Sequence, residues 1–115
     1  MKVIENQTHF ICPKISNALN AACTIITDHK NTFEKSLLAL ALISYIQPFM
    51  DGNKRTARIV SNALLMQEKY CPLSFRTVDS LEYKKAMLLF YEQNNLTAIK
   101  QIYIEQYKFA VETYF

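Results

Sequence analysis

The stretch that decides the fold runs from Gln47 to Arg58 and reads QPFMDGNKRTAR. It separates two segments with helical periodicity, and it contains Gly52, the only glycine among 115 residues. A lone glycine marks a backbone position that needs positive φ or the close approach of another group. Pro48 ends the helix before the stretch, because proline disfavours helical geometry in the residue that precedes it and has no amide hydrogen. We therefore predict a tight loop with a function between two helices.

The cations of this stretch conflict with a local preference. Lys54, Arg55 and Arg58 fall in the first turns of the following helix, where the helix dipole is positive and each cation is unfavourable by about 0.3 to 1 kcal/mol. A bound anion resolves the conflict, since it would receive free N–H groups from Gly52 to Lys54 and charge from two arginines that share a face. Phosphate fits best, and Asp51 adds one oxygen ligand for Mg²⁺. The alternative is a capped loop whose arginines pair with surface acids.

Periodicity outside the loop predicts an all-α fold, a compact bundle of about five helices with a short N-terminal extended arm. The first helix follows Pro13, and the second opens at Asn31 and is apolar almost all round from Leu37 to Ile43, so we expect it to be central. The third is expected to run to about Lys69. A cap at Asp79 opens the fourth helix, and the fifth starts at Asn94 or Asn95. Apolar stripes are expected to face the core. They are Ile15, Leu19, Ala22, Ile25 and Ile26 in the first helix, Ile59, Ala63 and Met66 in the third, Leu81, Met87, Leu88 and Phe90 in the fourth, and Ile99, Tyr103, Tyr107 and Ala110 in the fifth.

Composition excludes several classes of protein. Thirteen Lys and Arg against ten Asp and Glu give too small an excess to indicate a nucleic-acid partner. The three cysteines show no metal-ligand spacing, and no apolar run approaches the length of a membrane span. We therefore predict a single domain over residues 1–115 in the cytoplasm, with neither a nucleic acid nor a membrane as partner.

The loop resembles the signature of the Fic (filamentation induced by cAMP) family, also termed Fido. That signature reads His-x-Phe-x-Asp/Glu-Gly-Asn-Gly-Arg-x-x-Arg, and the matching residues are Pro48-Phe49-x-Asp51-Gly52-Asn53-x-Arg55-x-x-Arg58. The resemblance implies the helical Fic fold over the whole chain, with the arm from Lys2 to Pro13 as the end of the family's flap hairpin. Family members have further helices ahead of this point, so it also implies that N-terminal walls of the adenine pocket are missing. A fragment, a minimal form and a chain completed by a partner remain three readings.

The resemblance also implies a role for each position. It assigns loop anchoring to Phe49, Mg²⁺ binding to Asp51, phosphate binding to Gly52, Asn53, Lys54, Arg55 and Arg58, and docking of the target by strand addition to Val3 and Ile4. The implied reaction is transfer of AMP from ATP to a Ser, Thr or Tyr hydroxyl of a target protein. Lys54 stands where the family usually has glycine. The same Asn-Lys-Arg form is found in the death-on-curing branch, whose members phosphorylate their targets. AMP transfer and phosphoryl transfer therefore both stay open.

Gln47 occupies the position of the family's histidine, the general base. A glutamine amide accepts a hydrogen bond but has no usable pKa, and loss of a base typically lowers the rate by about 10²- to 10⁴-fold. His9 and His29 are the other candidate bases, and both are expected at the surface. One reading is an impaired transferase in which Gln47 positions the hydroxyl. Another is a degenerate module that binds nucleotide or a protein partner in a regulatory role, and a third is that Gln47 is an introduced substitution. A second copy of the chain or a complementing N-terminal segment is a further candidate partner.

Overall fold

The computed structural model describes residues 13–75 and 77–114, and this part of the chain is all helical, without strands. Its helices are α2 (Pro13–Asp28), α3 (Thr32–Ile46), α4 (Asn53–Gln67), α5 (Ser80–Gln93) and α6 (Thr97–Tyr114). The predicted all-α fold of about five helices is therefore confirmed. The predicted extended arm, with Val3 and Ile4, lies outside the described residues.

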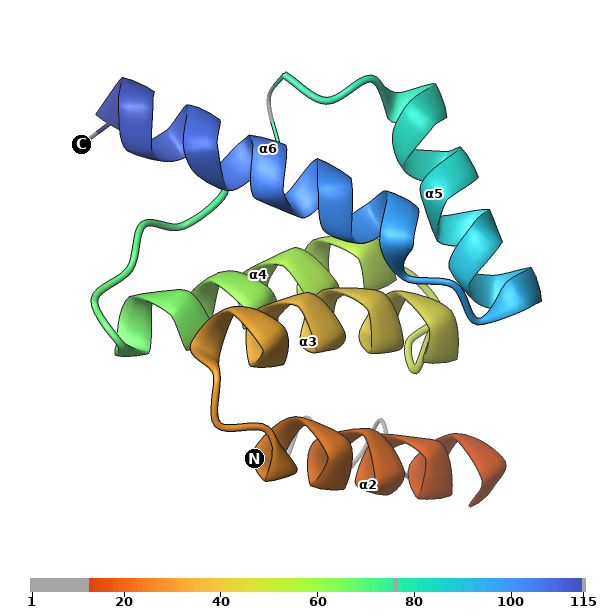
Figure 1. The fold of residues 1–115 in the computed structure, drawn as a ribbon. Helices are drawn as coiled ribbons and strands as arrows, with labels where there is room; N and C mark the ends of the chain where they lie inside the picture. Colours follow the sequence, from red (N-terminus) through yellow and green to blue (C-terminus); the bar gives the residue numbers. More distant parts are fainter. Residues whose placement is uncertain (1–12, 76, 115) are drawn as a thin grey trace.

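Helix α3 is the centre of the arrangement. It lies antiparallel beside α4, α2 runs along its other side, and α6 crosses above the pair with α5 next to it (Figure 1). Its buried residues are Ser36, Leu37, Ala39, Leu40, Ala41 and Ser44. The predicted central helix is confirmed.

The ends of α3 follow from its sequence. The Asn31 side chain accepts hydrogen bonds from the N–H groups of Phe33 and Glu34, at 2.9 and 3.2 Å, and so satisfies two of the donors that a helix start leaves unpaired. The helix ends at Ile46, two residues before Pro48. Both boundaries agree with the prediction.

Small side chains bring α3 and α4 close together. The Ser36 hydroxyl donates to the Ser61 carbonyl at 3.0 Å and also lies 2.7 Å from the Ser61 hydroxyl, and both residues are fully buried. Ala39 on α3 and Ala57 on α4 are likewise fully buried. Because the distance between packed helices depends on the side chains between them, these residues allow a close approach.

The stripe predicted to face the core on α4 is wrong. Ile59 and Met66 are 61% and 55% exposed, and Ala63 is also exposed. The buried residues of α4 are Ala57, Ser61 and Leu65. Small residues at positions 57 and 61 allow the close approach of α3, and the larger side chains of Ile59 and Met66 point to solvent instead.

The remaining predictions hold in part. Met87 and Phe90 of α5 are buried, but Leu81 and Leu88 are more than half exposed, and in α2 Ala22 is buried whereas Ile25 is 43% exposed. The predicted stripe of α6 is confirmed by the buried residues Ile99, Tyr103 and Ala110 and the half-buried Tyr107. Helix α4 ends at Gln67, two residues before the predicted end at Lys69. Helix α6 begins at Thr97 and not at Asn94 or Asn95, because Asn94 caps α5 and the Asn95 side chain accepts a hydrogen bond from the Thr97 N–H.

Two further features of the described residues bear on the predicted class of protein. No helix within 13–75 and 77–114 has the length and apolarity that crossing a membrane requires. Cys23 is exposed and Cys71 is buried, and neither forms a disulfide in this part of the chain.

We expect Ser61→Leu to destabilise the fold, because the larger side chain forces α3 and α4 apart and removes a partner of Ser36. The free energy of unfolding should fall by about 1 to 3 kcal/mol. Ala63→Leu is the matched control, two residues further along the same helix on the exposed side, and should change it by less than about 0.5 kcal/mol. Urea denaturation followed by circular dichroism measures both. Equal losses in the two variants would contradict this packing.

Candidate functional site

The loop begins with an unusual backbone at Gln47. Its φ and ψ are 51° and 61°, in the left-handed region, and its N–H donates to the Ile43 carbonyl at 3.0 Å. Helices commonly end in this way, although a residue other than glycine is uncommon there. Pro48 follows and is buried. The chain therefore turns sharply, and the exposed Gln47 is one of the residues that line the pocket described below.

The Asn53 side chain closes the loop. Its Oδ1 accepts from the Phe49 N–H at 2.9 Å, and its Nδ2 donates to the Phe49 carbonyl at 2.8 Å. An asparagine amide can pair in this way because it carries a donor and an acceptor side by side. Phe49 itself is half-buried, and Asn53 fixes its backbone.

Gly52 adopts the positive φ that the sequence predicts, at 78°. A Cβ at this position would meet no atom within 4 Å, so conformation and not crowding favours glycine. Gly52 is the N-cap of α4 and supplies no side-chain cap, and the helix begins with a bond from the Thr56 N–H to the Gly52 carbonyl. Among the described residues, no acceptor pairs with the N–H groups of Asn53 and Lys54.

One of the N–H groups expected to be free is paired. The Gly52 N–H donates to Asp51 Oδ1 at 2.8 Å, because the carboxylate folds back onto the amide that follows it. A phosphate that used this N–H would have to displace the carboxylate. The expectation of three free N–H groups from Gly52 to Lys54 is therefore wrong for the first of them.

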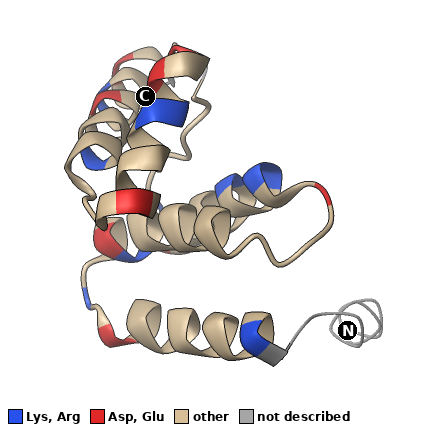
Figure 2. Ribbon diagram, turned by 90° about the vertical axis from the view of Figure 1, so that its right-hand side faces the viewer, with Lys and Arg blue, Asp and Glu red and all other residues tan. Residues whose placement is uncertain are grey.

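The loop and the start of α4 enclose a pocket of about 590 Å³. Basic residues gather at this end of α4, beside an acidic position on the loop (Figure 2). The residues that line the pocket are Gln47, Met50, Asp51, Gly52, Asn53, Lys54, Arg55, Arg58, Ile59 and Asn62. All predicted phosphate-binding positions thus meet in one concavity with Gln47 and Asp51, while Phe49 does not line it.

Three lining residues were missed by the sequence analysis: Met50, Ile59 and Asn62. Ile59 and Asn62 lie four residues beyond Arg55 and Arg58, so helical spacing alone would have placed them on the same face. The Asn62 amide forms a second clamp, since it accepts from the Leu73 N–H at 2.8 Å and donates to the Leu73 carbonyl at 2.9 Å.

The Arg58 side chain lies against two aromatic rings. Its guanidinium carbon is 4.8 Å from the centroid of Phe75 and 5.1 Å from that of Tyr83, and Lys54 Nζ is 5.4 Å from the same Tyr83 ring. Burial raises the pKa of the Tyr83 phenol, and the Arg58 charge opposes part of this rise. The Arg58 Nε is buried without a hydrogen-bond partner, and within the described residues neither Arg58 nor Arg55 forms an ion pair. The alternative of arginines paired with surface acids therefore has no support in this part of the chain.

Asp51 is an isolated carboxylate. The described residues contain no group of three or more His, Cys, Asp or Glu side chains placed to hold a metal ion. A Mg²⁺ ion at Asp51 would therefore take most of its oxygen ligands from phosphate and water, which is how this ion is commonly held beside nucleotides. The hard carboxylate oxygen fits that ion.

Of the two other candidate bases, the structure describes only His29. His29 is half-buried at the end of α2, with Nδ1 2.8 Å from the Ile25 carbonyl, and it does not line the concavity. His9 lies outside the described residues.

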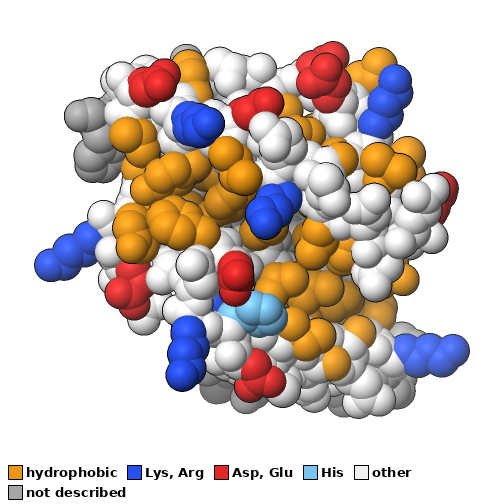
Figure 3. All heavy atoms as spheres, in the orientation of Figure 1, with side chains coloured by type: hydrophobic (Ala, Val, Ile, Leu, Met, Phe, Trp, Pro, Cys, Tyr) orange, Lys and Arg blue, Asp and Glu red, His pale blue; other side chains and the backbone are white. Residues whose placement is uncertain are grey.

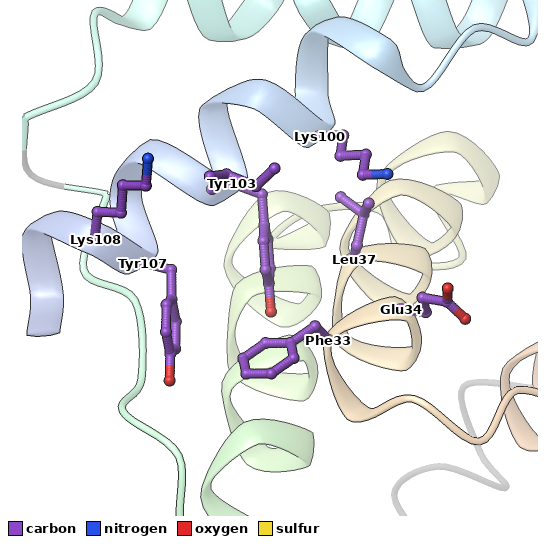
Figure 4. Close-up of a pocket in the computed structure, with 8 residues that line it drawn as sticks. Phe33, Glu34, Leu37, Lys100, Tyr103, Tyr107 and Lys108 are labelled. Atoms are coloured by element: carbon purple, nitrogen blue, oxygen red, sulfur yellow. The ribbon is translucent and has the colours of Figure 1, made fainter.

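A second hollow of about 310 Å³ lies between α3 and α6, where hydrophobic side chains gather on the surface (Figures 3 and 4). It is lined by Phe33, Glu34, Leu37, Lys100, Tyr103, Ile104, Tyr107 and Lys108. None of the predicted site residues is among them, so this hollow is separate from the loop pocket.

Known proteins resemble this chain in the part that contains the loop. The model of the Fic/DOC family matches residues 3–65, which is more than half of the chain. Over 39 residues the chain is 49% identical to the protein adenylyltransferase Fic of Nematostella vectensis, and this stretch covers 34% of the chain and 9% of that relative. The chain thus aligns with only a small part of the relative. No solved structure matches it.

Asn53→Ala removes both hydrogen bonds that hold the Phe49 backbone. We expect faster hydrogen exchange at the Phe49 amide and a fall of about 1 to 3 kcal/mol in the free energy of unfolding. Asn62→Ala is the matched control, because it also removes two bonds to a backbone but at Leu73, and should leave the Phe49 amide protected. Unchanged protection of Phe49 in Asn53→Ala would refute the role of this clamp.

Proposed function

The chain belongs to the Fic/DOC family, and we propose that its loop pocket binds Mg-ATP and that it transfers AMP to a Ser, Thr or Tyr hydroxyl of a protein at a reduced rate. The observation that carries the proposal is the convergence of Lys54, Arg55 and Arg58 on one pocket at the uncapped start of α4. No carboxylate of the described residues forms an ion pair with the two arginines. Polyphosphate is the ligand whose charge suits such a pocket.

Each group of the pocket has a role in this proposal. The N–H groups of Asn53 and Lys54 donate to phosphate oxygens, and Arg55 and Arg58 contact the β- and γ-phosphates. Asp51 is one ligand of the Mg²⁺ ion, which neutralises part of the phosphate charge when bound. Binding of the ion would draw the carboxylate away from the Gly52 N–H, which then becomes available to a phosphate oxygen.

The transfer itself is a displacement at phosphorus. The oxygen of the target hydroxyl attacks the α-phosphorus, the bond between that phosphorus and the oxygen bridging to the β-phosphate breaks, and pyrophosphate leaves. The hydroxyl proton passes to water, because Gln47 has no usable pKa and acts only as a hydrogen-bond acceptor that orients the hydroxyl. A loose transition state depends mainly on positioning and charge, so transfer persists at a rate about 10²- to 10⁴-fold below that with a base.

Other parts of the proposal rest on the family alone. Relatives of this kind modify protein targets, and the relative from Nematostella vectensis is named an adenylyltransferase, which favours AMP transfer over phosphoryl transfer. The flap positions Val3 and Ile4 would dock the target, within a single domain over residues 1–115. We place the reaction in the cytoplasm, where ATP is supplied.

A second candidate function is a binding module without transfer activity. It is favoured by one observation, namely that Gln47, whose side chain has no usable pKa, lines the same pocket as Lys54, Arg55 and Arg58. In that case nucleotide or a protein partner occupies the pocket, and occupancy regulates another protein. The two functions share the binding step and differ in the chemical step.

We expect calorimetric titration to detect binding of Mg-ATP, and Arg55→Ala to weaken it by about 10- to 100-fold, the effect of losing a hydrogen bond to a charged group. Lys85→Ala, which removes an exposed cation of α5 outside the pocket, is the control and should bind as the unchanged chain does. Chelation of Mg²⁺ should also weaken binding. Equal affinities of the Arg55 and Lys85 variants would exclude this pocket as the phosphate site.

Gln47→His separates the two candidate functions. If the chain is an impaired transferase, the variant should transfer label from α-labelled ATP to protein about 10²- to 10⁴-fold faster, with a rate that rises with pH near about 6.5 as the imidazole loses its proton. Gln47→Asn is the control and should gain nothing. Label transferred from γ-labelled ATP would indicate phosphoryl transfer. Nucleotide binding without transfer, even in Gln47→His, would leave the binding module as the function.

A further inference from the structure

The aromatic rings of Phe75 and Tyr83 have no part in the proposed transfer reaction, and yet they contact two cations of the phosphate pocket. We propose that Tyr83 and Phe75 are positioning residues of the phosphate pocket, which hold Arg58 and Lys54 over it without neutralising their charge and so favour polyphosphate over monophosphate. The inference rests on the proposed function, since it concerns the same pocket. The guanidinium carbon of Arg58 lies 4.8 Å from the Phe75 centroid and 5.1 Å from the Tyr83 centroid, and Lys54 Nζ lies 5.4 Å from the Tyr83 centroid.

Both rings are fixed in the core. Tyr83 on α5 is 2% exposed and Phe75, between α4 and α5, is 5% exposed. The rings pack edge to face, with centroids 5.9 Å apart and planes at 80°. Because protein cores are close-packed, neither ring can turn away from Arg58 without opening a void. The cation therefore lies on a rigid surface.

Helix α4 brings Phe75 to its own arginine. Asn62, one turn beyond Arg58, clamps the backbone of Leu73 with two hydrogen bonds, and Phe75 follows two residues later. Phe75 has a φ of 56°, which is a rare and unfavourable backbone conformation for a bulky residue. The clamp on Leu73 and the unfavourable backbone of Phe75 together place the Phe75 ring against Arg58.

A ring differs from a carboxylate in its effect on the pocket. The face of an aromatic ring attracts a cation through its quadrupole and leaves the net charge unchanged, whereas a carboxylate would cancel that charge and compete with phosphate. Lys54 and Arg58 are one turn apart on α4 and repel each other, and the Tyr83 ring, which both cations contact, offsets this repulsion. Burial raises the pKa of the Tyr83 phenol, so the ring stays uncharged at neutral pH.

Two substitutions separate the ring face from mere bulk. Tyr83→Phe keeps the ring and removes the hydroxyl, whereas Tyr83→Leu keeps an apolar side chain and removes the quadrupole. The probe is inorganic tripolyphosphate, with orthophosphate for comparison, because neither requires an adenine pocket. We expect Tyr83→Leu to weaken tripolyphosphate binding by about 3- to 30-fold and orthophosphate binding by less, and Tyr83→Phe to stay within about twofold of the unchanged chain.

A spectroscopic measurement reports the contact without any ligand. Stacking on the rings should shift the NMR signal of the Arg58 Nε–H group, and Tyr83→Leu should move that signal toward the position of an exposed arginine while Tyr83→Phe keeps it. Phe75→Leu repeats the test from the other ring if Tyr83→Leu does not fold. This signal separates loss of the contact from general loss of stability.

The outcomes distinguish this inference from the proposed function. Equal binding and an unmoved Arg58 signal in Tyr83→Leu would overturn the inference and leave the proposed function intact. Ring-dependent binding of tripolyphosphate in a chain that does not bind Mg-ATP would support the inference and defeat the proposed function. Failure of the unchanged chain to bind tripolyphosphate would overturn the inference, while the Mg-ATP titration decides the proposed function separately.

Discussion

The close contact of α3 with α4 sets the geometry of everything at the loop end of the molecule. Ser36 and Ser61 join the two helices by buried hydrogen bonds, and the loop must span the short gap between the end of one helix and the start of the other. The left-handed backbone at Gln47, the clamp from Asn53 to Phe49 and the positive φ of Gly52 are the local means by which the chain makes that turn. The pocket is therefore a consequence of how two helices pack.

The start of α4 carries cations where the helix dipole is unfavourable to them, and tertiary contacts offset this effect. Three cations lie in the first two turns of α4, where the helix dipole is unfavourable to them, and no acidic residue of the described chain pairs with the arginines. Buried aromatic rings from the segment after α4 and from α5 support Arg58 and Lys54 instead. The polyphosphate that we propose as ligand would supply the negative charge that no group within the described residues provides to the two arginines.

Local features of the sequence were sufficient for the order of the helices and for the content of the loop. Asn31 and Pro48 bound α3 because caps and proline act on the backbone around them, and Gly52 has the predicted φ for the same reason. The inner face of α4 was predicted wrongly, since hydrophobicity favoured Ile59 and Met66 whereas the tight contact with α3 selects Ser61. The Asn62 clamp and the Tyr83 ring were not found because each acts on residues distant in sequence, and no local pattern encodes such contacts.

The left-handed backbone at Gln47 sets the stability of the turn after α3 against the presence of a side chain in the pocket. Glycine adopts this conformation with less strain, by roughly 1 kcal/mol, and would make the turn after α3 more robust. It would also remove from the pocket lining the side chain that position 47 contributes. A turn rebuilt for maximal stability would therefore carry glycine at position 47 and contribute one lining group fewer to the pocket. Robustness of the turn and the chemical content of the pocket cannot both be maximised at this position.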